Sequence, residues 1–191
     1  MDVSEAIDRR RAYRSLAPVD ITDETVEVLA RAASLSASCF NNQPWRYVFV
    51  KDPDVLRRLF GALSDGNKWA TAASMIIAVT SRADLDCQIK SREYYLFDTG
   101  MATAFIILKA TELGLVAHPI AGYSPKKVRE VLGIPDDMNV VTLVIVGRHS
   151  DSIGELLSEE QAKVELERPE RKPLSETAYL DAYGEGLGGD S

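Results

Sequence analysis

The segment DTGMATAFIILKATELGLVAHPIAG, residues Asp98–Gly122, decides the fold of this chain. Its first half places apolar residues such as Phe105 at almost every angle around a helix. A helix that is apolar nearly all round lies in a core or at a subunit interface. Gly114 suits the left-handed position that ends a helix. We therefore predict a long helix over Ser91–Leu113, followed by a strand that ends near His118.

Three further segments are typical of strands. Met75–Thr80 (MIIAVT) and Val140–Val146 (VVTLVIV) are continuous apolar runs, which indicate strands covered on both faces. Arg46–Lys51 (RYVFVK) predicts a third strand. Helical segments alternate with these runs. The pattern predicts an α+β fold in which a mixed β-sheet is flanked by helices.

Capping residues mark the other helices. An N-cap side chain accepts a hydrogen bond from the first helical turn, and proline fits the first helical position. On these signals we predict helices that begin at Thr22, at Asp52-Pro53 (to about Leu63) and at Ser124-Pro125 (closed by Gly133), and a short helix over Asp2–Arg11.

The length of 191 residues suits one domain, with 46% hydrophobic and 27% charged residues. We predict a single domain over residues 1–174 and a C-terminal tail over 175–191. The tail is expected to fray in part, because its last eight residues hold four glycines. The polar segment Ser150–Lys172 is expected to run over a surface as an arm.

The net charge of −7 resides in the C-terminal part: from residue 151 onward there are 11 acids and 4 bases, which leaves 18 of each before it. A chain without a broad basic face is a poor nucleic-acid binder, so no such partner is expected. Two cysteines and two histidines without ligand spacing give no metal site. With no signal peptide and no long apolar run, we expect no membrane partner, a cytoplasmic location, and free thiols at Cys39 and Cys87.

Two basic segments are candidates for binding an anion. Arg9–Arg14 (RRRAYR) places four arginines near a helix end, and guanidinium groups bind phosphate through two parallel hydrogen bonds. A solvated surface cluster is the alternative. Arg171-Lys172 is a weaker basic pair within the acidic region.

Two loops are candidates for holding a flat ring. Ser38–Trp45 (SCFNNQPW) is rich in amide side chains, which donate and accept hydrogen bonds at the edge of a heteroaromatic ring. The alternative is an Asn-rich turn with Trp45 in the core. His118–Gly122 (HPIAG) forms a rigid turn whose backbone N–H groups could point outward, or simply a connection into the next helix, with His118 more typical of a structural histidine.

Together and in this order, these segments resemble the nitroreductase family of flavoproteins. RRAYR resembles the family's RRSxR motif, and SCFNNQPWRYVFV resembles its Ser-x-x-Asn-x-Gln-Pro-Trp segment and following strand. The Asp98–Gly122 segment resembles its Asp-x-Gly helix and the loop that passes the flavin. ERKPLSE resembles its closing basic motif. The resemblance runs from about Ile7 to Pro173.

The resemblance implies an intertwined homodimer with two FMN molecules at the interface, each contacted by both subunits. The arginines and the late basic pair would hold the phosphate, and one asparagine would approach the ring from the same subunit. The amide-rich loop would reach in from the partner, and the N–H groups of Ala121 and Gly122 would face N5 and O4 of the ring. The cofactor-binding residues expected on this basis are Arg10, Arg11, Arg14, Ser38, Cys39, Asn41, Gln43, Asn67, Pro119, Ile120, Ala121, Gly122, Arg171 and Lys172.

The implied activity is an FMN-dependent oxidoreductase that takes hydride from NADH or NADPH and reduces a small nitroaromatic- or quinone-like acceptor by a ping-pong mechanism. No side chain is expected to be catalytic, because the flavin carries the chemistry. The chain departs from the family in having Ala12 where a serine is usual, and Ala121 where some relatives have glutamate.

Other functions stay open at this point. Relatives include a flavin-fragmenting enzyme of the cobalamin pathway and a halotyrosine dehalogenase, although the span between Thr80 and Asp98 is short for the dehalogenase lid. An FMN-binding protein without turnover, acting as a flavin reservoir or sensor, is the main alternative. A flavin-free interaction protein that keeps only the fold is the third.

Overall fold

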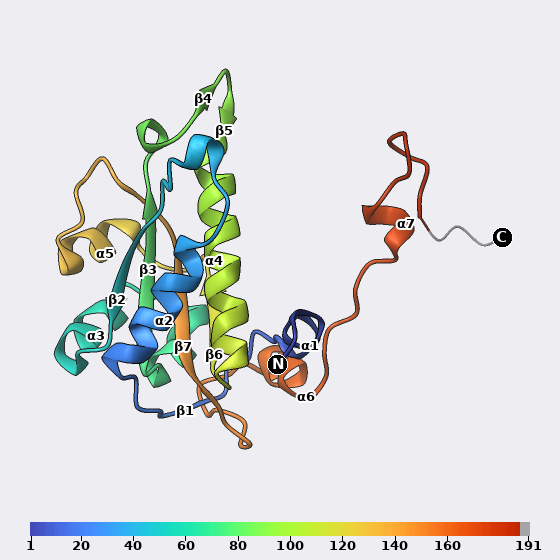
Figure 1. Cartoon of the computed structure of the whole chain (residues 1–191). Coiled ribbons are helices and arrows are strands. Elements are labelled where there is room, and N and C mark those ends of the chain that lie inside the picture. The colour runs from blue at the N-terminus through green and yellow to red at the C-terminus, as the bar shows by residue number, and fades with distance from the viewer. Residues whose placement is uncertain (188–191) are drawn as a thin grey trace.

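The computed structural model describes residues 1–187 and shows a central β-sheet with helices on both faces (Figure 1). The elements are α1 (Val3–Arg9), β1 (Leu16–Ala17), α2 (Asp23–Ser34), η1 (Cys39–Asn41), β2 (Arg46–Val50), α3 (Pro53–Phe60), η2 (Asp65–Ala72), β3 (Met75–Ser81), η3 (Ala83–Leu85), β4 (Gln88–Ile89), β5 (Arg92–Glu93), α4 (Tyr94–Glu112), β6 (Val116–Ile120), α5 (Pro125–Leu132), β7 (Asn139–His149), α6 (Glu159–Leu166) and α7 (Leu174–Thr177).

The long strand β7 organises the sheet. It pairs with β3 along one edge and with β6 and β1 along the other, and β2 follows β3. Every strand pair within residues 1–187 is antiparallel, so the prediction of a mixed sheet is wrong. The reason is visible at Val50, which pairs with Ile76. The helical excursion after β2 returns to the end of the sheet where it began, and the α+β class itself is confirmed.

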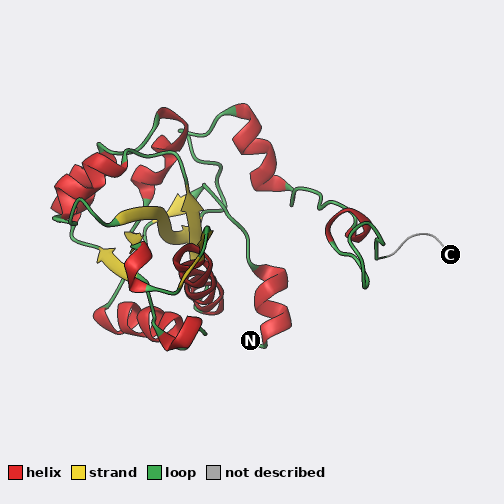
Figure 2. Ribbon diagram, turned by 90° about the horizontal axis from the view of Figure 1, so that it is seen from above, coloured by secondary structure: helices red, strands yellow, loops and turns green. Residues whose placement is uncertain are grey.

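Helices lie on both sides of the sheet, as Figure 2 shows from above, and an apolar layer fills the space on each face. Alternate residues of a strand point to opposite faces, so Ile77 joins one layer and Ile76 the other. On the first face α2 and α4 pack against the sheet, with Ile106 fully buried. On the second face lie α3, η2 and α5, with Leu59 and Val128 fully buried. All seven residues of β3 are buried, which confirms the reading of its apolar run.

The capping signals are confirmed at each predicted helix start. The side chains of Thr22, Asp52 and Ser124 accept hydrogen bonds from the first turns of α2, α3 and α5. Gly133 closes α5 with a φ of 65°, a left-handed angle at which glycine is favoured. The helix α4 begins three residues later than predicted, because the residues before it form the β4–β5 hairpin.

One face of α4 is apolar and exposed. Phe97 is 58% exposed and Phe105 is 43% exposed, and Ala104 is exposed between them. These positions lie seven and eight residues apart, so they share a side of the helix. Within residues 1–187, no helix combines the length and the hydrophobicity that crossing a membrane requires.

The C-terminal segment leaves the sheet. After β7 the chain forms α6, which the sequence analysis did not place within its predicted surface arm, and then runs outward through α7 (Figures 1 and 2). Leu174 and Leu180 are exposed there. The predicted boundary between domain and tail stays a prediction, and the expected fraying falls partly on residues 188–191, outside the described residues.

Candidate functional site

Five arginines gather beside the end of α1. Arg10, Arg11 and Arg14, from the segment after α1, line a cavity of about 220 Å³ with Arg168 and Arg171, from the segment after α6. We call these five residues the arginine pocket. Within residues 1–187, none of them forms an ion pair with a carboxylate. The pocket therefore carries positive charge that the protein leaves uncompensated.

Arg10 lies at the centre of this charge. Burial lowers the pKa of Arg10, and the neighbouring Arg168 and Arg171 lower it further by repulsion. The guanidinium stays charged nonetheless, because its ordinary pKa is far above neutrality. A cluster of this kind is relieved by a bound anion, and its forked donors suit the oxygens of a phosphate.

Two predicted phosphate ligands have partners elsewhere. Arg11 donates to the carbonyls of Val164 at 2.7 Å and Glu167 at 2.9 Å, where α6 ends. Lys172 forms an exposed ion pair with Glu176 at 3.4 Å. Their contact with a phosphate stays a prediction, whereas Arg168, which the sequence analysis missed, lies in the pocket and donates to the Arg10 carbonyl at 3.2 Å.

A buried carboxylate holds the arginine segment in place. Glu165 of α6 is 6% exposed and accepts hydrogen bonds from the backbone N–H of Arg14 at 2.7 Å and of Ser15 at 3.0 Å. No sequence signal distinguishes Glu165, because it is one acid among many in an acidic region. It fixes the backbone of the arginine pocket without neutralising its guanidinium groups by direct pairing.

The turn after β6 meets η2 at close range. Asn67 donates to the Gly122 carbonyl at 2.9 Å and accepts from the Trp69 indole at 3.2 Å. A Cβ atom on Gly122 would lie 2.4 Å from the Asn67 amide nitrogen and 2.5 Å from the Ser64 hydroxyl. Only glycine allows this approach without displacement. The structure thus brings together two predicted site segments, η2 and the 119–122 turn.

The backbone of this turn has free donors. Ala121 is exposed, and within residues 1–187 neither its N–H nor that of Gly122 donates to a protein acceptor. Pro119 is exposed, whereas the Ile120 side chain is buried in the core. The turn can therefore present two N–H groups to a ligand, while Ile120 anchors it.

His118 joins this turn to the arginine segment. It is 7% exposed, its ring lies 4.7 Å from that of Trp69, and its Nδ1 lies 3.0 Å from the Tyr13 carbonyl. Burial lowers the pKa of His118, which favours the neutral ring. Since a carbonyl only accepts, Nδ1 carries the proton and donates it. The role is structural, as the sequence indicated.

The residues Ser38–Gln43, which we call the amide loop, lie beside the N-terminal end of α4. The Cys39 N–H donates to the carboxylate of Asp98, in the second turn of α4, at 2.6 Å. Arg46 donates to the Gln43 carbonyl at 3.0 Å, a contact that the sequence analysis missed. Asn41 is exposed, and Trp45 is buried beneath the loop as expected.

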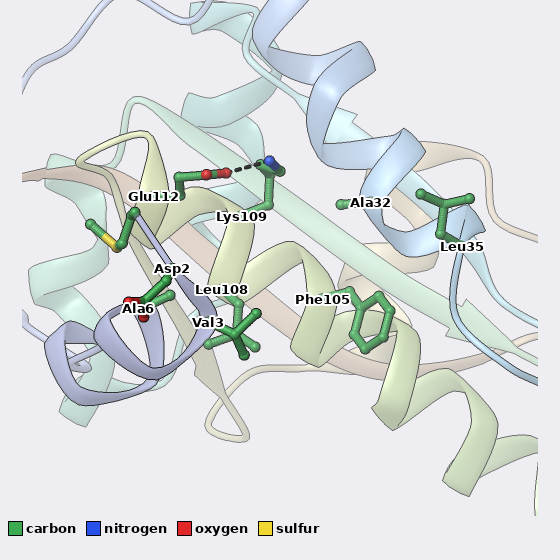
Figure 3. Close-up of a pocket in the computed structure, with 10 residues that line it drawn as sticks. Asp2, Val3, Ala6, Ala32, Leu35, Phe105, Leu108, Lys109 and Glu112 are labelled. Atoms are coloured by element: carbon green, nitrogen blue, oxygen red, sulfur yellow. Dashed lines mark hydrogen bonds and ion pairs between the residues drawn. The ribbon is translucent and has the colours of Figure 1, made fainter.

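The two halves of the predicted site do not meet within one chain. In Figure 3, residues of α1 and residues Lys109 and Glu112 of α4 line one pocket, so α1 lies near the C-terminal end of α4. At 1.5 Å per residue, Lys109 lies about 16 Å along the helix from Asp98, which holds the amide loop. The arginine segment follows α1, so the loop and the arginine pocket are separated along α4. This placement is compatible with the expectation that the loop serves a partner's site.

The prediction of free thiols is wrong. Cys39 and Cys87 form a disulfide that links the amide loop to the segment after η3. The two residues are 48 positions apart, and their spacing carries no signal. They meet because the chain turns back after β3 and passes the loop. The cytoplasmic location that accompanied this expectation stays a prediction.

A family model described as "Nitroreductase family" matches residues 7–148 of this chain. The chain belongs to the nitroreductase family. This confirms the resemblance drawn from the arginine, amide-loop and Asp98–Gly122 segments.

Individual members of the nitroreductase family show the same relationship. An Archaeoglobus fulgidus protein, provisionally named NADH dehydrogenase/NAD(P)H nitroreductase, is 30% identical over 146 residues, which cover 74% of this chain and 82% of that protein. A crystal structure described as an oxidoreductase containing FMN has a TM-score of 0.81 and 28% identity, covering 96% of this chain and 93% of that one. A nitroreductase from Exiguobacterium sibiricum in complex with FMN has a TM-score of 0.70 and 22% identity, covering 79% and 90%.

Proposed function

We propose that this nitroreductase-family chain binds FMN, takes hydride from NADH or NADPH, and reduces a small nitroaromatic- or quinone-like acceptor by a ping-pong mechanism. The observation that carries the proposal is the arginine pocket, whose charge has no carboxylate partner within the described residues. The FMN reported for two similar structures agrees with this chemistry.

The residues of the pocket fit a phosphate monoester. Arg10, Arg14 and Arg171 supply charged donors around one cavity, which suits the single terminal phosphate of FMN. Arg11 and Arg168 line the same cavity, and Lys172, which follows Arg171 in the chain, would support them.

The turn after β6 would hold the ring. The N–H groups of Ala121 and Gly122 are free to donate to N5 and O4, and Asn67 fixes the turn through the Gly122 carbonyl. Pro119 and Ile120 set its direction from the strand. When bound, FMN supplies the hydride-accepting and hydride-donating centre. Donors that are already ordered need no rearrangement as negative charge develops beside them.

A second copy of the chain would complete the site. The face of α4 that bears Phe97 and Phe105 is apolar and exposed in the single chain, and we propose that it forms the core of a homodimer. In that dimer the partner's Ser38, Cys39, Asn41 and Gln43 would reach the flavin held by the arginine pocket. An obligate dimer buries more than about 1,600 Å², so sedimentation at low micromolar concentration should show a dimer. A stable folded monomer would contradict it.

The cofactor is tested by absorbance and mass spectrometry of the purified protein. We expect a flavin band near ~450 nm and release of FMN, since the pocket offers donors for one phosphate group. FAD at full occupancy, or a colourless protein that FMN does not restore, would overturn the proposal. Anaerobic addition of NADH or NADPH should then bleach the band. Bound FMN that neither nucleotide reduces would instead indicate a flavin reservoir or sensor.

A further inference from the structure

The disulfide end of the molecule holds a second cluster of reactive groups. The sulfur atoms of Cys39 and Cys87 and a carboxylate oxygen of Asp86 all lie within 4.8 Å of one another. In the single chain both cysteines are only half-buried, so solvent can approach the disulfide there. The cluster lies about 16 Å along α4 from the residues beside α1, away from the arginine pocket.

Two carboxyl groups lie against the disulfide with unused oxygens. Asp86 is 8% exposed and Asp98 is 1% exposed. Asp98 accepts from the Cys39 N–H, and Asp86 accepts from the Cys87 N–H at 2.8 Å. One oxygen of each carboxyl is buried without a hydrogen-bond partner. Burial and the neighbouring Asp86 raise the pKa of Asp98, so this carboxyl retains its proton more readily than an exposed aspartate does.

Asn42 makes the two sulfur atoms of the disulfide chemically different. Its side-chain amide donates to the Cys87 sulfur at 3.6 Å and to Asp86 at 3.3 Å. A donor at a sulfur atom stabilises negative charge that develops there, and a more stable thiolate leaves faster. Cys87 is therefore the better leaving group, and Cys39 is the sulfur open to attack.

We propose that the Cys39–Cys87 disulfide is a second redox centre, which exchanges with a small dithiol and receives its proton from the Asp86–Asp98 pair. In the first step a thiolate of the dithiol attacks the Cys39 sulfur. The Cys39–Cys87 bond breaks, a mixed disulfide forms, and Cys87 leaves as a thiolate that takes a proton through Asp86. Asp98 acts as a positioning residue, because it holds the Cys39 backbone.

In the second step the other thiol of the dithiol attacks the mixed disulfide. Cys39 is released and protonated, and the dithiol departs as a cyclic disulfide. Two electrons and two protons pass to the protein, and the dithiol loses the same number. The exchange needs no flavin, so an experiment can contradict it without contradicting the proposed function.

Reduction of the disulfide also removes the covalent link between the amide loop and Cys87. Phe40, Asn41 and Gln43 have φ values of 48°, 58° and 49°, left-handed angles that non-glycine residues rarely adopt. Such strain persists only where the surroundings enforce it. Loss of the disulfide should therefore loosen the loop, which amide hydrogen exchange over residues 38–43 would show as faster exchange.

The first experiment treats the folded, purified protein with dithiothreitol and then with a thiol-alkylating reagent. We expect both cysteines to be alkylated without denaturant, and the disulfide to reform when oxidised dithiothreitol is added. Protection of both cysteines until the protein is unfolded would overturn the proposal, because it would show a purely structural disulfide.

The second experiment compares the rate of reduction in Asp86→Asn with that in Asp84→Asn, an exposed neighbour in η3. If Asp86 delivers the proton, Asp86→Asn should slow reduction at least about tenfold and Asp84→Asn should leave it unchanged. A carboxylate that only repels the thiolate predicts the opposite, so equal or faster reduction in Asp86→Asn overturns the proposal. Should Asp86→Asn fail to fold, Asn42→Ala tests the other part of the mechanism, the stabilised Cys87 leaving group. Slower reduction is expected from the loss of the donor, and unchanged reduction overturns the proposal.

Discussion

Different interactions hold the segments at the two ends of α4, the arginine pocket and the amide loop. Near the C-terminal end of α4, the arginine pocket is fixed through its backbone by Glu165, while its side-chain charges are left without carboxylate partners within residues 1–187. At the N-terminal end, the amide loop is held by a disulfide, by Asp98 and by Arg46, and its backbone is strained. One end leaves charge available for a ligand, and the other fixes a shape. Substitutions at the two ends should therefore fail in different ways.

The largest effect is expected for Arg10→Ala. A charge-assisted hydrogen bond in a partly desolvated pocket contributes about 3 kcal/mol at most, so FMN affinity should fall by up to about 100-fold. Removing one of several crowded positive charges should leave the ligand-free protein as stable as the parent, or more stable. Flavin titration and thermal unfolding of the flavin-free protein measure the two effects.

The control for Arg10 is Arg57→Ala, which removes an exposed arginine of α3 paired with Asp54. It should leave flavin affinity unchanged. If both variants retain flavin equally, the arginine pocket does not hold the phosphate and the contrast between the two ends is lost.

A smaller effect is expected for Gly122→Ala. Its Cβ would displace the Asn67 amide, which would then lose its bond to the Gly122 carbonyl and its bond from Trp69. Such overpacking costs about 2 kcal/mol. Gly66→Ala is the matched control, because nothing lies within 4 Å of its added Cβ. Denaturant unfolding compares them, and equal stability would mean that the turn accommodates the methyl group.

Glu165→Gln should act on the arginine pocket through its backbone. The amide can accept only one of the two N–H bonds that the carboxylate accepts, and its NH₂ group would face the other donor. We expect a loss of about 1.5 kcal/mol in stability and a weaker flavin affinity. Glu160→Gln, an exposed acid in the same helix, should change neither. Unchanged flavin affinity in Glu165→Gln would separate this carboxylate from the pocket.

The smallest effect, and one of opposite sign, is expected for Asp98→Asn at the amide loop. Burial raises the pKa of Asp98 above its ordinary 3.8, with Asp86 adding to the shift. The folded protein thus binds this proton more tightly than the unfolded chain, so the parent loses stability as pH rises through the interval above 3.8. Asparagine can still accept from the Cys39 N–H but carries no charge.

The Asp98→Asn variant should therefore be as stable as the parent, or more stable, at neutral pH, and the difference should shrink as pH falls toward 4. Thermal unfolding at several pH values measures this difference. A variant whose disadvantage grows with rising pH would show that the charged carboxylate stabilises the loop.

Local signals predicted most of the secondary structure. The caps at Thr22, Asp52 and Ser124 fixed three helix starts, and the apolar run of β3 indicated its burial on both faces. These signals succeed because they depend on neighbouring residues. The antiparallel order of the sheet was missed, because the direction in which a strand returns depends on contacts between distant segments.

The sequence by itself determined the family, the starts of three helices and the buried strand β3. Only the tertiary structure decided that Arg168 joins the arginine pocket, that Glu165 holds its backbone, and that Cys39 pairs with Cys87 beside two buried carboxyls. The physical reason is the same in each case. A charge or a thiol has no periodicity of its own, so its role depends on which groups the fold places within a few ångströms of it.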